Sequence, residues 1–318
     1  MKTSIINNPA DAALEITAGR IVALPTETVY GLAADALNPS AVLKIYETKK
    51  RPDFNPLIVH VSGIEEFEKY AEFIPESVFK IADTFSPGPI TYVLNKKSII
   101  PDIVTAGIDT VALRIPAHPL FRQVLTMCGK PIAAPSANMF GRISPTTAED
   151  VLKELDGKIE YVLDGGRCRI GIESTVVRFE DDKIIILRHG FVTKEDIEKV
   201  TGKEVTALKG KASKISSPGM LLSHYSPHTP LYIAEDLEYF KNVNANAGIV
   251  DFGVYGDLKE TALNLFSDLR IADEKNFNYL VTRLVENKGL GRAINDRLVK
   301  ASSGRAVVEY GSVLFSKK

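Results

Sequence analysis

Residues 19–31 read GRIVALPTETVYG, and this stretch decides the class of fold that we expect. Its first half, Gly19–Pro25, is a short apolar run bounded by a glycine and a proline, which is typical of a buried strand. Its second half opens a turn that carries two hydroxyls, a carboxylate and a phenol. Because ligands of open α/β sheets bind where strands end, we expect a polar ligand here. A turn in which Thr26 caps a helix fits the same residues.

Similar runs recur through the first two thirds of the chain, each rich in Val, Ile or Tyr and bounded by Gly, Pro or Asp. They predict strands at Leu57–Val61, Ile90–Leu94, Thr110–Pro116, Pro131–Pro135, Ile159–Leu163, Ser174–Phe179 and Lys183–Arg188. Helical patterns cover Ala41–Thr48, Pro119–Cys128, Thr146–Leu155 and Thr193–Val200, and the last two open with capping sequences, Thr146 with Glu149 and Thr193 with Asp196. Because strands and helices are mixed rather than strictly alternating, we predict one α/β domain with a mixed sheet over residues 1–205.

Residues 206–228 differ in composition from what precedes them. They are rich in Gly, Ser, Lys and Pro and show no periodicity, which predicts an interdomain linker. The segment exceeds the usual ceiling of about 12–15 residues for structureless loops, and such long loops are often functional. Residues 229–318 then alternate predicted strands with predicted helices, which indicates a smaller second α/β domain. The strands are Leu231–Ala234 and Gly248–Phe252, and the helices are Leu237–Val243 and Asn276–Asn287.

Composition and charge exclude several classes of protein. The 318 residues are 45% hydrophobic and 25% charged, the ordinary globular balance, and no run approaches the ~20 apolar residues of a membrane helix. We expect no secretory signal, and we expect Cys128 and Cys168 to be reduced thiols in a cytoplasmic protein. Residues 1–205 carry 24 basic and 28 acidic side chains, a net −4 that argues against a protein whose main task is to bind a nucleic-acid backbone. A P-loop sequence is absent from the chain.

Cations and small residues form further candidate sites. The triplet Lys49-Lys-Arg51 suits phosphate, although on its own it is more typical of a solvated basic helix end. Residues 133–145 combine small side chains with hydroxyls and an amide, and they suit either a closely approaching ligand or a turn with a helix cap. Glycines at 165–166, 171 and 190 could expose backbone N–H groups to an anion. His224 and His228 are four apart, but Pro227 and Pro230 break the helix that a metal pair needs.

Arg114 interrupts an otherwise apolar strand. A buried arginine is costly unless an anion pairs with it. We therefore expect beside Arg114 either an internal carboxylate such as Glu173 or the carboxylate of a ligand. We interpret His118 as structural.

The order and the exact sequences of these segments, taken together, identify a family more specifically than any single segment does. PTETVYGL, K-x-R with NPLIVH, SPGPITYVL, VTAGIDTVALRIPAHP, APSAN, SPT, DGG, ESTVV, LRHG and PGMLLSHYSP closely resemble the YrdC-type threonylcarbamoyl-AMP synthases, in their long two-domain form. The resemblance covers nearly the whole chain and is densest in residues 20–228. It implies an open twisted mixed sheet, a smaller Rossmann-like domain over residues 229–318, and a linker, 206–228, that acts as an active-site lid.

The resemblance also implies an activity. Enzymes of this family are nucleotidyltransferases that condense L-threonine, bicarbonate or CO2, and ATP into threonylcarbamoyl-AMP and pyrophosphate, with Mg²⁺ accompanying ATP. A partner transferase then modifies the adenosine beside the anticodon of certain tRNAs, and we expect neither a membrane nor a stable nucleic-acid complex. Two alternatives share the fold: an RNA-binding module, and the carbamoyl-transfer domain of hydrogenase maturation proteins. The first is disfavoured by charge, and the second by a cysteine count too low for that protein's zinc modules.

Residue roles follow from the same resemblance. The L-threonine pocket would comprise Thr26, His60, Arg114 and Ser174, with Arg114 on the substrate carboxylate. The ATP site would comprise Lys49, Arg51, Asn55, Thr110, Ser136, Asn138, Ser144, Arg188 and Tyr225, of which Lys49 and Arg51 would be catalytic. Two segments, Asp53-Phe54 and Asn295–Arg297, differ from the sequence motifs of the family.

Overall fold

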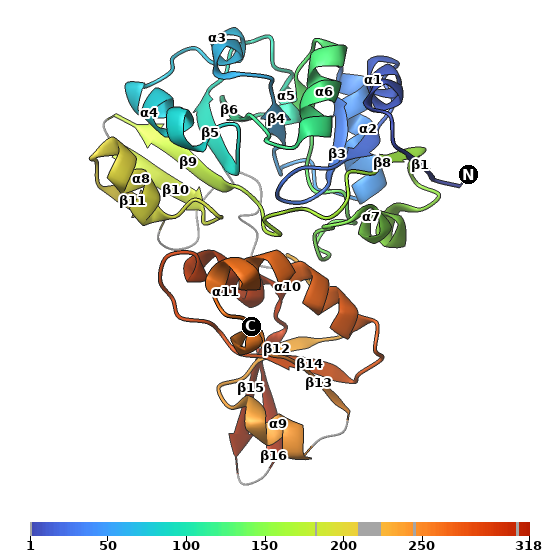
Figure 1. The fold of residues 1–318 in the computed structure, drawn as a ribbon, viewed down its shortest axis with the longest axis vertical. Coiled ribbons are helices and arrows are strands. Elements are labelled where there is room, and N and C mark those ends of the chain that lie inside the picture. Colours follow the sequence, from blue (N-terminus) through green and yellow to red (C-terminus); the bar gives the residue numbers. More distant parts are fainter. Residues whose placement is uncertain (1, 182, 209–223, 244–245, 310–311) are drawn as a thin grey trace. The chain divides into compact units, whose positions relative to one another are not determined.

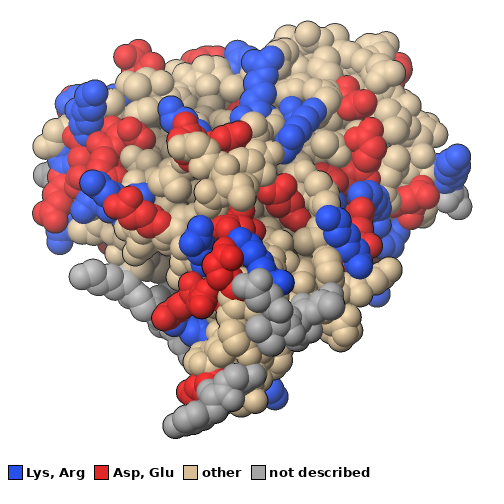
Figure 2. All heavy atoms as spheres, turned by 60° about the horizontal axis from the view of Figure 1, so that its bottom comes forward, with Lys and Arg blue, Asp and Glu red and all other residues tan. Residues whose placement is uncertain are grey.

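The computed structural model describes residues 2–181, 183–208, 224–243, 246–309 and 312–318. Most of the predicted linker and lid, residues 209–223, lies outside the described residues. The chain divides into two compact units, the first formed by Met1–Phe140 and Pro145–Met220, the second by Gly141–Ser144 and Leu221–Lys318 (Figure 1). None of the described helices is long and apolar enough to cross a bilayer. On the face shown in Figure 2, acidic and basic side chains are interspersed.

The first unit is built on an eleven-stranded sheet in the order β1-β8-β2-β3-β7-β4-β6-β5-β9-β10-β11. Its strands are β1 (Ser4–Ile6), β2 (Val22–Leu24), β3 (Gly31–Asp35), β4 (Ile58–His60), β5 (Ile90–Asn95), β6 (Thr110–Arg114), β7 (Ile132–Ala133), β8 (Tyr161–Leu163), β9 (Thr175–Glu180), β10 (Lys183–Arg188) and β11 (Val205–Ala207). Strand β6 pairs parallel with β4 and antiparallel with β5. The predicted mixed α/β sheet is therefore confirmed.

The helices of this unit begin and end where local sequence favours it. They are α1 (Pro9–Thr17), α2 (Pro39–Lys49), α3 (Phe67–Tyr70), α4 (Glu76–Phe85), α5 (Asp102–Thr105), α6 (Pro119–Cys128), α7 (Ala148–Leu155) and α8 (Lys194–Thr201), with a 3-10 turn at Ile64–Glu66. The predicted box of Thr193 with Asp196 caps α8. The box predicted for α7 is wrong by one residue: Thr147 pairs with Asp150, because Thr146 lies outside the helix and donates its own N–H and hydroxyl to Asp150.

The two faces of the sheet differ. Along β6, Leu113 points into the main hydrophobic core, whereas Ala112 and Arg114 point to the opposite face, as strand alternation requires. On that opposite face, α1 and α6 pack over one part of the sheet. Beside them lies a small apolar cluster made only of strand residues: Ile58, Val93, Ala112, Val176 and Leu187. The candidate site lies on this strand-lined face.

The second unit has a five-stranded sheet in the order β13-β14-β12-β15-β16. Its strands are β12 (Leu231–Ile233), β13 (Ala247–Val250), β14 (Tyr279–Thr282), β15 (Gly304–Glu309) and β16 (Ser312–Lys317), and its helices are α9 (Leu237–Val243), α10 (Leu258–Asp273) and α11 (Gly291–Ala301), with a 3-10 turn at Phe252–Val254. Parallel strands with intervening helices confirm the second α/β domain.

One element of the second unit was predicted wrongly. The helix expected over Asn276–Asn287 is a strand, β14, followed by a loop. Leu280 and Val281 are fully buried, and β14 is hydrogen-bonded on both sides, to β12 and β13. Tertiary pairing of a buried run with β-branched and aromatic residues therefore outweighs the local helical pattern.

Candidate active site

A row of polar side chains crosses the strand-lined face of the first unit. His60 pairs with Arg114 in the β4–β6 register. Tyr92 pairs with Leu113 between β5 and β6, which places Thr91 opposite Arg114. Because directly paired residues face the same side of a sheet, His60, Arg114 and Thr91 share this face.

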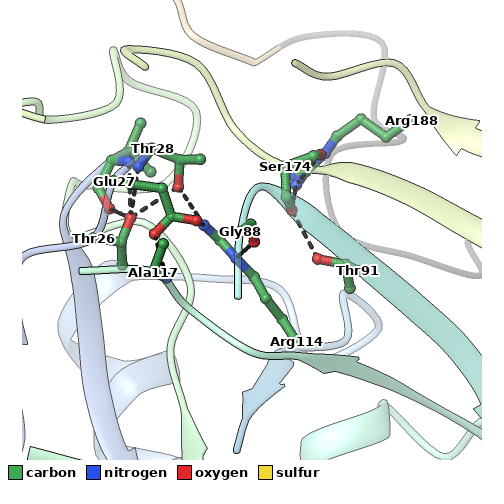
Figure 3. Close-up of polar contacts among 10 residues, drawn as sticks. Thr26, Glu27, Thr28, Gly88, Thr91, Arg114, Ala117, Ser174 and Arg188 are labelled. Carbon is green, nitrogen blue, oxygen red and sulfur yellow. Dashed lines mark hydrogen bonds and ion pairs between the residues drawn. The ribbon is translucent and has the colours of Figure 1, made fainter. Parts of the chain in front are cut away.

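Arg114 is buried, and its guanidinium is held from two sides (Figure 3). Nη2 donates to Glu27 Oε1 at 2.6 Å and to Thr28 Oγ1 at 3.0 Å, and Nε donates to Gly88 O at 3.3 Å. Nη1 makes no hydrogen bond to any described residue, and it is not sealed from solvent. Arg114 is thus fixed in orientation with one nitrogen available to a ligand.

The internal carboxylate beside Arg114 is Glu27, not Glu173, which was the example we expected. The second oxygen of Glu27 accepts the Ala117 N–H at 3.0 Å. Sequence reasoning missed Glu27 as a partner because the contact joins residues 87 positions apart. The available signal was the strand arginine itself, which requires an anion, and the acidic residue in the turn after β2.

Thr26 and Thr28 have different surroundings. The Thr26 hydroxyl accepts the N–H groups of Thr28 and Val29 and donates to Val29 O, so it organises the turn after β2. The Thr28 hydroxyl lies 2.8 Å from that of Thr26 and accepts from Arg114. Thr26 therefore contacts the predicted carboxylate site through Thr28, which was not among the residues predicted for the threonine pocket.

Ser174 joins two predicted subsites. Its hydroxyl lies 2.8 Å from Thr91 Oγ1 and 3.0 Å from Arg188 Nη2, and its main-chain oxygen accepts from Arg188 Nε and Nη2. All three side chains are buried. Figure 3 shows Ser174 between Arg188 and Thr91. Thr91 was missed because a threonine within an apolar strand is an unremarkable sequence feature.

His60 lies in an apolar environment. Its ring contacts Phe121 at a centroid distance of 5.0 Å, and Nδ1 lies 3.3 Å from Ile132 O. Burial first, and then the positive charge of Arg114, lower the pKa of His60 to about 3. The imidazole is therefore neutral at physiological pH and is suited to hydrogen bonding rather than to proton transfer.

Lys49 is buried and is wrapped by the loop that carries Ser136 and Asn138. Its Nζ donates to Ser136 O at 2.6 Å and to the main-chain oxygen of Asn138, and lies 3.5 Å from Asn138 Oδ1. Burial, followed by repulsion from Arg51, lowers the pKa of Lys49 well below its ordinary value. The structure thus brings together three residues predicted for the ATP site.

Arg51 and Asn55 adjoin this cluster. Arg51 donates to Asn55 O at 3.0 Å and to Pro56 O at 2.8 Å, and its guanidinium lies over the Phe140 ring. The amide nitrogen and oxygen of Asn55 are both buried, and neither has a hydrogen-bond partner in the described structure. Because an unpaired buried amide is costly, Asn55 is placed as if to receive polar atoms from a ligand.

The remaining predicted ATP-site residues belong to other elements. Thr110 is the half-buried first residue of β6 and pairs with Asn95. Ser144 and Tyr225 belong to the second unit, where Tyr225 stacks on Phe266 at a centroid distance of 5.4 Å.

Comparison with known proteins shows the family of this chain. A family model described as "Telomere recombination" matches residues 15–190, and one described as "Threonylcarbamoyl-AMP synthase, C-terminal domain" matches residues 192–303. A threonylcarbamoyl-AMP synthase of Pyrococcus abyssi is 41% identical over 320 residues, covering 93% of this chain and 94% of that protein. One of Bacillus subtilis is 40% identical and covers 95% of each chain. The crystal structure of P. abyssi Sua5 complexed with L-threonine has a TM-score of 0.88 at 39% identity, and covers 94% of this chain and 98% of that one.

The fold, the two matched regions and the polar row define a two-domain nucleotidyltransferase with a YrdC-like first unit. Identities of about two fifths extend over nearly the full length of the relatives. The chain belongs to the threonylcarbamoyl-AMP synthase family, an enzyme family of tRNA modification, and the predicted resemblance is confirmed.

Proposed function

We propose that this chain condenses L-threonine, bicarbonate or CO2, and ATP into threonylcarbamoyl-AMP and pyrophosphate on the strand-lined face of the first unit. The observation that carries the proposal is the fixed guanidinium of Arg114, whose Nη1 is available to a ligand. His60 and Thr91 are its strand neighbours on the same face of the sheet. A buried arginine with one available nitrogen suits a carboxylate.

The threonine subsite would be formed by this row. Arg114 Nη1 would bind the substrate carboxylate, and the neutral His60 and the Ser174 hydroxyl would offer hydrogen bonds to the remaining polar groups. Thr26 would act by holding the turn that carries Thr28. The L-threonine complex of the P. abyssi relative supports the choice of amino acid.

The ATP subsite would use the Lys49 cluster and Arg188. The unpaired Asn55 amide would take a hydrogen bond from the nucleotide, and Arg51 and Arg188 would contribute positive charge toward the phosphates. Thr110, Ser136, Asn138, Ser144 and Tyr225 remain predicted contacts of the nucleotide. Within the described part of the chain, no group of three or more His, Cys, Asp or Glu residues is placed to hold a metal. Mg²⁺ would accompany ATP on its phosphates. There it would neutralise the charge that develops on the leaving pyrophosphate.

The reaction needs orientation more than a protein base. The threonine amine adds to CO2 and loses a proton to form a carbamate. A carbamate oxygen then attacks the α-phosphorus in line, one P–O bond forms, and the bond to pyrophosphate breaks. Because the attacking oxygen is already anionic, the chain's task is to align two anions and stabilise the added charge with fixed cations. A downstream transferase would pass the threonylcarbamoyl group of this mixed anhydride to tRNA.

The direct test is pyrophosphate release with labelled threonine. We expect release, and a labelled AMP adduct, only when ATP, Mg²⁺, threonine and bicarbonate are all present. Release that is independent of threonine or of bicarbonate would contradict the proposal. The double variant Arg114→Met/Glu27→Gln should reduce threonine-dependent pyrophosphate release while ATP remains bound. The second substitution avoids leaving a buried carboxylate without its partner.

A further inference from the structure

The Glu27–Arg114 ion pair has a feature that the proposed reaction does not use. Both side chains are more than nine-tenths buried, with exposed fractions of 8% and 5%. Both oxygens of Glu27 are engaged, one by Arg114 and one by the Ala117 N–H. A full negative charge is therefore held at a fixed place beside the cation that would bind substrate.

The charge of this pair bears on which anions can bind. Arg114 and Glu27 together are neutral, so Arg114 Nη1 offers hydrogen bonds without the field of a lone cation. L-Threonine enters the site as a zwitterion with no net charge, before its amine becomes a carbamate, and the attraction and repulsion that Glu27 exerts on this zwitterion largely offset each other. Pyrophosphate carries several negative charges, all of which Glu27 repels.

The site must distinguish these two kinds of ligand. Arg188 donates to the Ser174 hydroxyl, which in turn contacts Thr91 of the polar row. Two arginines therefore lie on the same face of the sheet. If Arg188 receives phosphates and Arg114 receives a carboxylate, an unpaired Arg114 would compete for the same polyphosphate. A carboxylate placed at one arginine removes this competition.

We propose that Glu27 is a specificity-determining residue that reserves Arg114 for the carboxylate of a zwitterionic amino acid and excludes phosphate and pyrophosphate. This inference rests on the proposed role of Arg114 in the threonine subsite. Glu27 would act through electrostatics on the bound anion, in addition to holding the guanidinium in place.

The test uses Glu27→Gln in the full-length chain, with inorganic pyrophosphate as the probe and without ATP. Threonine binding and thermal unfolding are measured at constant ionic strength. In the wild type, we expect pyrophosphate to leave threonine binding unchanged. In E27Q, pyrophosphate should compete with threonine and raise the melting temperature, with a gain in affinity on the order of 10- to 100-fold because one unit charge is removed close to a polyanion.

Two controls separate charge from stability. Glu27→Asp keeps the charge but shortens its reach, so pyrophosphate should still be excluded even if threonine binds less tightly. Asp35→Asn is the matched control, because Asp35, like Glu27, accepts from one cationic side chain and one main-chain N–H. These donors are Lys130 at 2.7 Å and Leu37 at 2.9 Å. Asp35→Asn should lower stability without creating pyrophosphate binding.

The outcomes distinguish this inference from the proposed function. If E27Q shows no pyrophosphate-dependent rise in melting temperature beyond that of the wild type, or if the rise survives Arg114→Met in the E27Q background, the selectivity role of Glu27 is overturned. A third outcome is that Arg114→Met in the E27Q background abolishes the pyrophosphate-dependent rise in melting temperature and yet leaves threonine binding unchanged. In that case Glu27 still controls anion access, and the assignment of threonine to Arg114 is wrong.

Discussion

Arg188 donates to two oxygens of Ser174, and its Nη2 lies 2.9 Å from the main-chain oxygen and 3.0 Å from the hydroxyl. One residue was predicted to contact the nucleotide and the other the amino acid. Their direct hydrogen bonds mean that a shift of Ser174 on threonine binding changes the surroundings of Arg188. Because Thr91 lies 2.8 Å from the same hydroxyl, the position of Ser174 depends on both neighbours.

Thr91→Val removes one of these contacts with little change in volume. We expect the KM for threonine to rise about 5- to 10-fold, the cost of one hydrogen bond, with a smaller effect on the affinity for ATP. Thr91→Ser should restore most of the loss. In a double-mutant cycle with Ser174→Ala, the effects should be less than additive, and strict additivity would contradict the coupling.

Asn55→Leu should separate stability from binding. Because the Asn55 amide is buried without a partner, an apolar side chain of similar size should leave the free energy of unfolding unchanged or raise it by about 1 kcal/mol. ATP affinity should fall about tenfold, measured by titration calorimetry. A clear loss of stability with normal ATP binding would show that Asn55 is structural.

Lys49→Met should affect both folding and activity. It leaves the main-chain oxygens of Ser136 and Asn138 without their buried donor, at a cost of about 1–3 kcal/mol each. Turnover should fall on the order of 100-fold if the cation also stabilises the transition state. Lys50→Met is the matched control, because Lys50 is an exposed neighbour and should change neither property. Wild-type turnover in K49M would remove Lys49 from the catalytic residues.

The pH dependence of stability should report His60. Its pKa is about 3 in the folded protein, below the unfolded value of about 6.5, so between these values the unfolded chain binds the extra proton. Stability from this group is present above pH 6.5 and is lost as pH falls toward 3. Between pH 7 and 5, we expect the wild type to lose about 1–2 kcal/mol more than His60→Gln. If the wild type and His60→Gln lose equal stability between pH 7 and 5, His60 is protonated in the folded protein in this range, and the account of its environment is contradicted.

Much of the fold was predictable because its signals are local. The strands at Ile58–His60, Ile90–Asn95 and Lys183–Arg188 are short apolar runs between turn residues, and α8 begins at the predicted cap, Thr193. The strand Tyr279–Thr282 was missed because its identity depends on two neighbouring strands rather than on its own pattern.

The site was predictable as a set of residues but not as a set of contacts. Arg114 demanded an anion, yet only strand register and the turn after β2 bring Glu27 to it. Residues 141–144 were expected in the first domain, but they group with the second unit, where Gly141 O accepts the Ser226 N–H and Ile143 O accepts from Arg270. Such pairings join distant segments and leave no local signature.

The central claim is that Arg114 holds the threonine carboxylate on the strand-lined face of the first unit. The most direct measurement is titration of L-threonine into the wild type and into the charge-matched variant R114M/E27Q, with ATP binding followed in parallel. We predict that threonine affinity falls on the order of 10- to 100-fold, the cost of a charge-assisted hydrogen bond, while ATP affinity stays close to the wild-type value. Unchanged threonine affinity in a folded variant would contradict the account.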